Sequence, residues 1–175
     1  MIITNDEKAL RVFCEPVLSQ EISELVETLE KELNYANTLG KSGIGLAAPQ
    51  IGIAKDIAII RLPKLNLNLV NAKLDKGFDP AIFKDEGCLS FPGRTEDTTR
   101  FQEVYITNNM AEPHSFIATG FLAVVVGHEL DHLNSTLFMD RIHLKQVTII
   151  NTIKVGSNEL CPCNSGKKYK RCCKK

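Results

Sequence analysis

The residues most capable of chemistry in this chain are His128, Glu129 and His132, which form an H-E-x-x-H sequence late in a strongly apolar segment. Side chains four positions apart lie on the same face of a helix, so both imidazoles can hold one metal ion. Glu129 stands beside them, where its carboxylate can act on a water molecule instead of serving as a ligand. The motif therefore predicts a metal-dependent hydrolase. A structural helix that carries these residues without chemistry is the plainer alternative.

The sequence beyond this motif does not supply the third ligand of familiar H-E-x-x-H peptidases. One peptidase pattern requires a glycine and a histidine where this chain has Ser135 and Phe138. Another takes a glutamate from a later helix, and the only acidic residues after the motif are Asp140 and Glu159. A catalytic site of this kind needs three protein ligands and an open position. A small metallopeptidase therefore stays an alternative that lacks a convincing third ligand.

Two further motifs precede the histidines, G-I-G-L-A-A-P-Q at residues 43–50 and E-G-C-L-S at residues 86–90. With these motifs in this order before H-E-L-D-H-L, the chain resembles the peptide deformylases over roughly residues 7 to 143. Those enzymes remove the formyl group from the N-terminal methionine of nascent chains. The resemblance implies an α+β fold in which antiparallel or mixed strands surround a central helix carrying H-E-x-x-H. It also implies N-formyl-methionyl nascent peptides as the substrate.

The resemblance assigns Cys88 as the third metal ligand, beside His128 and His132. A thiolate donates more charge than a carboxylate, so it weakens the metal as a Lewis acid and suits a softer or redox-active divalent ion. Ferrous iron is the metal that the resemblance favours, with nickel, cobalt and zinc as alternatives. Glycine at position 127 and serine at 135 depart from the usual pattern of the family, which bears on pocket shape and rate.

The resemblance also assigns the other roles in the reaction. Glu129 accepts the proton of the attacking water, and the side-chain amide of Gln50 and the backbone N–H of Leu89 bind the formyl oxygen. Independently of the resemblance, Asp131 flanks the metal-facing side of the helix, which favours support of the ligands or an ion pair, for example with Arg100, over a catalytic role. Substrate binding is expected from Gly43, Ile44, Gly45, Gly87, Arg94, Val124 and Val125. Core packing is an alternative role for the two valines, as is an ordinary surface position for Arg94.

The last residues of the chain form a separate segment with a cysteine motif, C-x-C-x₈-C-C, made of Cys161, Cys163, Cys172 and Cys173. This pattern is similar to the SEC-C motif, a small zinc knuckle, and four thiolates can close a tetrahedral structural zinc site. Residues 156–175 carry a net charge of +5 on a chain whose total is zero. The basic charge predicts an acidic partner such as RNA, in the ribosome or nascent-chain machinery. A disordered basic tail is the alternative.

Length and composition set the domain organisation. With 175 residues, 43% of them hydrophobic, the chain suits one soluble domain with a small appendage. We expect a catalytic domain at residues 1–155, a linker at 156–160 and the zinc motif at 161–173. No apolar run spans a membrane and the start has no secretory pattern, so a reducing, cytoplasmic location is expected. Cys14 is expected to be a buried apolar residue.

Periodicity predicts the elements that position these residues. Apolar residues at helical spacing indicate a helix over 19–34, and the apolar stretch 116–133 indicates a second, central helix. Strands are expected at 56–62, 65–70, 104–107 and 147–155, with a loop at 73–84. An inactive deformylase-like protein that acts through its tail is a further alternative. The intact ligands, Glu129 and Gln50 argue against it.

Overall fold

The structure is a computed structural model that describes residues 1–142 and 168–171. The chain divides into two units, Met1–His143 and Leu144–Lys175. In the second unit, Tyr169–Arg171 form one 3₁₀ turn, η4. The strand predicted at 147–155 and the four tail cysteines lie outside the described residues, so those two predictions stay predictions.

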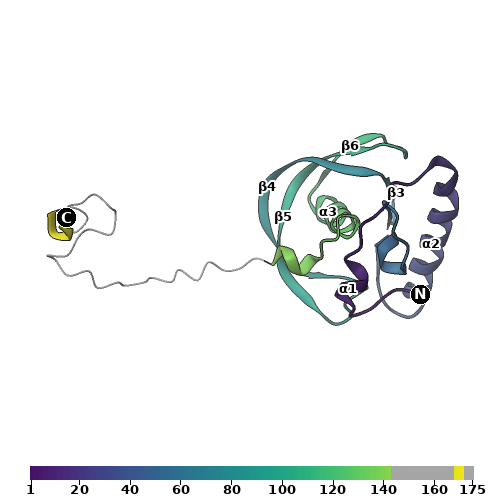
Figure 1. The fold of residues 1–175 in the computed structure, drawn as a ribbon, viewed down its shortest axis with the longest axis horizontal. Coiled ribbons are helices and arrows are strands. Elements are labelled where there is room, and N and C mark those ends of the chain that lie inside the picture. Colours follow the sequence, from purple (N-terminus) through teal and green to yellow (C-terminus); the bar gives the residue numbers. More distant parts are fainter. Residues whose placement is uncertain (143–167, 172–175) are drawn as a thin grey trace. The chain divides into compact units, whose positions relative to one another are not determined.

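The first unit contains two three-stranded antiparallel sheets with one helix between them (Figure 1). One sheet has the order β1-β2-β3, with β1 at Gly45–Ala47, β2 at Ile57–Leu62 and β3 at Leu65–Val70. The other has the order β4-β5-β6, with β4 at Ala72–Gly87, β5 at Thr95–Asn108 and β6 at Ser115–Thr119. The helices are α1 at Glu7–Leu10, α2 at Ile22–Thr38 and α3 at Phe121–Leu133. Short 3₁₀ turns occur at Ser19–Glu21 (η1), Ala48–Ile51 (η2) and Phe138–Arg141 (η3).

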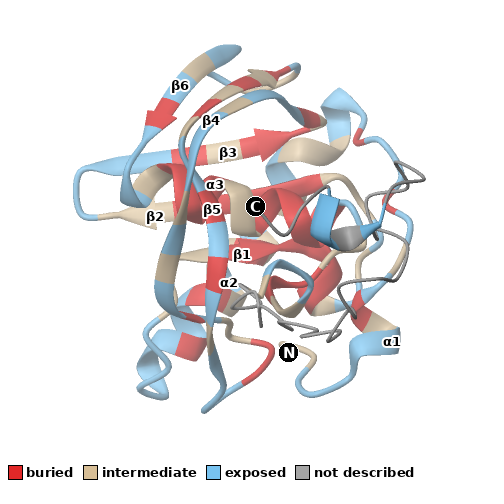
Figure 2. Ribbon diagram, turned by 90° about the vertical axis from the view of Figure 1, so that its left-hand side faces the viewer, coloured by how far each residue is buried: buried red, intermediate tan, exposed pale blue. Residues whose placement is uncertain are grey.

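Helix α3 lies at the centre of this unit, as its apolar sequence predicts. It packs against β5 and β6 on one side and against β1 and β2 on the other. Figure 2 shows α3 and β1 largely buried, while much of β4 and β6 is exposed. The shared core includes Leu67 and Leu69 from β3, Val104 and Ile106 from β5, and Val126 from α3. The two layers therefore close around the helix that carries the histidines.

The amphipathic helix predicted at 19–34 is confirmed and continues to Thr38. Its first turn is η1, where the carboxylate of Glu21 accepts a hydrogen bond from the backbone N–H of Leu18, 2.7 Å away. Leu29 and Leu33 point inward and are almost completely buried against β1 and β2. The helix ends before Gly40, whose φ of +76° is a left-handed conformation that favours glycine.

The loop predicted at 73–84 is wrong, because this stretch belongs to β4. Its side chains are mostly exposed and many are polar, so the sequence carries little of the apolar alternation typical of strands. Pairing with β5 along almost its whole length provides the hydrogen bonds that the local sequence does not predict. Register shifts between Leu74 and Lys76 and between Phe83 and Glu86 bend the strand, and Asp85 in the second of them is at positive φ.

The helix predicted at 116–133 begins only at Phe121. Residues 115–119 form β6, which pairs with β5 from Glu103 to Thr107. A continuous apolar run has no periodicity to separate a buried strand from a buried helix. The change of structure falls at Gly120, where φ is +57°. Among the described helices, none is long and apolar enough to cross a membrane.

Asp56 lies just before β2 and is expected to weaken the fold at neutral pH. Burial raises the pKa of Asp56 to about 6, against the opposing charge of Lys73. Its Oδ1 atom is buried and has no hydrogen-bond partner within the described residues. The pKa of Asp56 is higher in the folded than in the unfolded protein. The free energy of unfolding therefore decreases as pH rises from about 4 to 6 and this side chain loses its proton. A pKa difference of this size corresponds to about 3 kcal/mol, and solvent screening of the partly exposed side chain reduces it to about 1 kcal/mol.

We therefore expect Asp56→Asn to raise the melting temperature by a few degrees at pH 8 and to leave it unchanged at pH 4. Thermal unfolding of the variant and the wild type at pH 4, 6 and 8 measures this difference. A variant that is equally shifted at all three pH values would contradict the argument from Asp56.

Candidate active site

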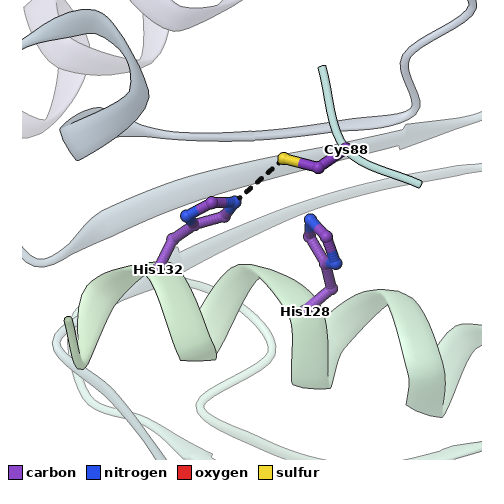
Figure 3. A group of neighbouring side chains, drawn as sticks. All are labelled: Cys88, His128 and His132. Carbon is purple, nitrogen blue, oxygen red and sulfur yellow. Dashed lines mark hydrogen bonds between the residues drawn. The ribbon is translucent and has the colours of Figure 1, made fainter. Parts of the chain in front are cut away.

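Three potential metal ligands converge where β4 ends above α3. Cys88 follows β4 directly, and His128 and His132 lie one helical turn apart on α3. Figure 3 shows the thiol and both imidazoles directed toward a common point. Their donor atoms all lie within 4.8 Å of one another, and the Sγ of Cys88 is 3.3 Å from the Nε2 of His132. One thiolate and two imidazoles at this spacing fit a divalent metal ion with an open position.

The orientation of His128 is set by Glu86 on β4. The Nδ1 of His128 lies 2.6 Å from the carboxylate of Glu86, which leaves Nε2 to face the other ligands. Glu86 in turn accepts two hydrogen bonds from Arg100, at 2.8 and 2.6 Å, and one from the hydroxyl of Thr98. Glu86 and Arg100 are both buried. The first ligand on the helix is thus held by a buried ion pair from the sheet.

The predicted ion pair of Asp131 with Arg100 is present, at 2.6 Å. Asp131 also binds Arg141, whose guanidinium lies 2.7 Å from the second carboxylate oxygen. A chain of alternating charges therefore runs from His128 through Glu86, Arg100 and Asp131. This chain fixes α3 against β5, because each buried charge has a partner of opposite sign.

The electrostatic field at the ligands favours a cation. Burial alone would lower the pKa of His128, but its hydrogen bonds to Cys88 and Glu86 raise it to about 10. Burial likewise opposes the charge of Glu86, and the contacts with His128 and Arg100 nevertheless lower its pKa to about 2. The anionic partners that stabilise a proton on His128 would equally stabilise a divalent metal in its place.

His132 differs from His128 in its surroundings. Burial and, to a smaller extent, the charge of His128 lower the pKa of His132 well below its ordinary value. The ring is therefore neutral, as an imidazole that binds a metal must be. Its Nδ1 atom is buried and lacks a hydrogen-bond partner in the described part of the chain.

Glu129 lies next to His128 on α3 and is only 4% exposed. Burial raises its pKa to about 7, while the charge of His128 acts in the opposite direction. Its Oε2 atom is buried and finds no partner among the described residues. A carboxylate with a pKa near neutrality and an unused oxygen is suited to accept and return a proton.

Gln50 presents its amide nitrogen to the thiol. The Oε1 atom accepts a hydrogen bond from the backbone N–H of Ala47 at 2.8 Å, which fixes which way the amide points. Its Nε2 donates to the hydroxyl of Ser90 at 3.1 Å and faces the Sγ of Cys88 at 3.4 Å. Gln50 is 2% exposed. The amide therefore offers N–H groups directly beside the metal ligands.

A cleft of about 560 Å³ opens above these residues. Its lining includes Gln50, Cys88, Leu89, His128 and Glu129, and also every residue predicted to bind substrate, namely Gly43, Ile44, Gly45, Gly87, Arg94, Val124 and Val125. Val124 and Val125 are more than 90% buried, so they belong to the core as well as to the cleft wall. Arg94 pairs with Glu96 at 2.9 Å and remains partly exposed.

The sequence interpretation missed three aromatic residues of the cleft wall, Phe83, Phe91 and Phe121, and the ring centroids of Phe83 and Phe121 are 6.1 Å apart. Phe121 precedes His128 by seven residues, which is two helical turns, so helical spacing could have identified it. Phe83 carried no such signal, because it lies in the part of β4 that was expected to be a loop.

Family models and individual relatives both match this chain to the peptide deformylases. The family model for polypeptide deformylase matches residues 1–147, and the SEC-C motif matches residues 158–175. Peptide deformylase from Wolinella succinogenes is 34% identical over 154 residues, covering 82% of this chain and 88% of that protein. Peptide deformylase from Aquifex aeolicus is 36% identical over 134 residues, covering 72% and 76%.

Solved structures agree with the fold. The peptide deformylase from Synechococcus elongatus in complex with actinonin has a TM-score of 0.72 at 32% identity, covering 83% of this chain and 79% of that one. The enzyme from Thermotoga maritima has a TM-score of 0.71 at 28% identity, covering 82% and 97%.

Fold and site together define a metal-dependent amide hydrolase. The chain belongs to the polypeptide deformylase family. It removes the formyl group from the N-terminal formyl-methionine of nascent polypeptides and releases formate. Membership in this family sets aside the metallopeptidase alternative.

Proposed function

We propose that Cys88, His128 and His132 hold the catalytic divalent metal, with ferrous iron favoured and nickel, cobalt and zinc as alternatives. The convergence of one thiol and two imidazoles within 4.8 Å carries the proposal. A thiolate favours a softer or redox-active ion, and imidazole suits iron, nickel, cobalt and zinc alike. When bound, such an ion supplies the Lewis acidity that brings the pKa of water toward neutrality.

Glu129 serves as the general base and then as the general acid. It accepts a proton from the attacking water, whose oxygen adds to the formyl carbon. As the bond between this carbon and the amine nitrogen breaks, Glu129 returns the proton to the amine, and formate and a free N-terminus result. Its pKa of about 7 and its position beside the ligands support both roles.

The formyl oxygen gains negative charge in this reaction, and Gln50 with the backbone N–H of Leu89 stabilises it. An amide donates hydrogen bonds without adding a charge that would compete for the proton of the water. The hydrogen bond from Ala47 holds the Gln50 amide in one orientation, so its nitrogen stays directed at the site. Leu89 follows Cys88 directly in the chain and lines the same cleft.

The peptide binds along β1, with the methionine side chain in the cleft. Among the described residues β1 pairs only with β2 in its sheet, so its other edge could bond an extended chain. Glycines at 43 and 45 allow a close approach of the two backbones. Val124 and Val125 in the cleft wall, with Ile44 and Leu89, provide apolar contacts for methionine.

Formate release from a formyl-methionyl peptide by anaerobically purified protein tests this function. The matched control is the same peptide with an acetyl group in place of formyl. We expect stoichiometric formate and free methionyl peptide from the first substrate alone. Cleavage inside the peptide without formate would contradict this function.

The C-terminal motif is proposed to bind a structural zinc through Cys161, Cys163, Cys172 and Cys173, and to recruit the cytoplasmic enzyme to the ribosome or nascent-chain machinery. The match to the SEC-C motif and the basic charge of this region support the proposal. Lys168, Lys170 and Arg171 are exposed. We propose a catalytic domain at residues 1–155, a linker at 156–160 and the zinc motif at 161–173; the two family matches cover residues 1–147 and 158–175.

Removal of residues 157–175 should cost one zinc per chain and leave turnover of short peptides within about twofold, because no catalytic group lies there. Elemental analysis and formate release measure the two effects. The truncated form should also co-sediment less with ribosomes, and binding of the full chain should fall steeply with salt if phosphates are the partner. Equal sedimentation of both forms would refute recruitment by the tail.

A further inference from the structure

Gly45 on β1 is packed directly against the carboxylate of Glu129. A Cβ atom added at Gly45 would overlap the Oε1 atom of Glu129 and lie only 2.7 Å from its Cδ and 3.1 Å from its Cγ. Real Cβ atoms do not come so close to other heavy atoms, so a side chain at this position requires Glu129 to move. The backbone of β1 thus forms one wall of the space that the carboxylate occupies.

The backbone conformation at position 45 does not itself require glycine. Among the described residues, the glycines at positive φ are Gly40, Gly52, Gly93 and Gly120, and Gly45 is not one of them. Position 45 also lies within a regular strand pair, opposite Ile60 of β2, where alanine is ordinarily tolerated at least as well as glycine. The contact with Glu129 is therefore a reason for glycine at this position that is separate from backbone conformation and from the approach of the peptide.

Gly43 provides a comparison two residues earlier. A Cβ there would meet the Leu89 side chain and, at 3.1 Å, the Cδ1 atom of Leu33. These are ends of apolar side chains that can turn aside. At Gly45 the group that must yield is the buried carboxylate proposed to move the proton.

We propose that Gly45 is a positioning residue: the absence of its side chain sets how far the Glu129 carboxylate stands from β1, and thereby its distance from the metal ligands. This inference rests on the proposed role of Glu129 and deepens it. Glu129 is only 4% exposed and lines the cleft, so a carboxylate displaced from β1 would have to move toward the cleft. A methyl group on β1 would push the carboxylate out of its place beside His128.

The first experiment compares Gly45→Ala, Glu129→Asp and the double variant in formate release, with metal content measured for each. A displacement of about 1 Å at a catalytic group costs about 100-fold in rate, so we expect kcat of Gly45→Ala to fall about 100-fold with KM little changed. Asp is shorter by one methylene and leaves room for the new methyl group. The fold-decrease in kcat caused by Glu129→Asp should therefore be at least 10-fold smaller in the Gly45→Ala background than in the wild type.

Gly127→Ala is the matched control, since it adds a methyl group one residue before His128. A Cβ there would meet only Arg100, at an ordinary contact distance of 3.6 Å. We expect the turnover of this variant to stay within a few-fold of the wild type and its melting temperature to be equal or higher, because alanine favours helix.

A second experiment reports on the contact even if the variants are too slow to assay. Gly45→Ala should raise the melting temperature by about 3 °C in a Glu129→Ala background, where the methyl group fills the vacated space. In the wild-type background the same change should give no rise. This comparison does not depend on the catalytic role of Glu129, so it separates an error in that role from an error in the contact.

Three results would overturn the proposal. One is a Gly45→Ala variant whose kcat stays within threefold of the wild type while KM rises, which would mean that the methyl group obstructs the peptide. Another is a fold-decrease in kcat on Glu129→Asp that is equal in the wild-type and Gly45→Ala backgrounds. The third is an identical shift in melting temperature with and without the Glu129 side chain.

Discussion

Replacing Glu129 by glutamine is expected to abolish deformylation, lowering kcat by several orders of magnitude, while one catalytic metal stays bound. The substitution keeps the size of the side chain but removes the group that accepts and returns the proton, so both proton transfers fail. It removes none of the three converging donors, which come from Cys88, His128 and His132. Formate release and metal content, measured on the same preparation, give the two readings.

The matched control is Glu27→Gln on the exposed side of α2, which should leave both readings unchanged. If Glu129→Gln retained more than a tenth of the wild-type rate, another group would have to act as the base. If it lost the metal, Glu129 would be a ligand and the proposed donor set would be incomplete.

Replacing Cys88 by serine is expected to weaken catalytic metal binding severely and to abolish turnover with it. A serine hydroxyl is a poor ligand for a soft divalent ion at neutral pH, whereas a thiolate is a strong one. The full chain should then lose one metal equivalent of the two proposed. Elemental analysis after extensive dialysis, with iron and zinc counted separately, measures the loss.

Cys14→Ser is the control for this experiment, since Cys14 is the other cysteine among the described residues. Burial and, to a smaller extent, the charge of Asp56 raise the pKa of the Cys14 thiol to about 11. The thiol therefore stays protonated at neutral pH and does not act as a metal ligand. We expect this variant to keep its metal and its turnover. A Cys88→Ser protein with unchanged metal content would exclude the site built on Cys88, His128 and His132.

The chemistry of this protein could be predicted from sequence because its essential residues stand in short motifs. His128, Glu129 and His132 are placed together by the geometry of a single helix, which depends on local hydrogen bonds alone. The amphipathic helix α2 could be predicted for the same reason, since its apolar spacing is a local property. The approach of Cys88 to the two histidines could be expected only through resemblance, because 40 residues separate it from His128.

Other features were decided by tertiary structure. Residues 72–87 form a strand because β5 offers hydrogen bonds along its length, and residues 115–119 join the same sheet although their apolar run reads as helix. The contacts of His128 with Glu86 and of Glu129 with Gly45 join segments that are far apart in the chain. Such contacts depend on how closely two packed elements approach. That distance results from the packing of the whole core, and no local pattern of residues contains it.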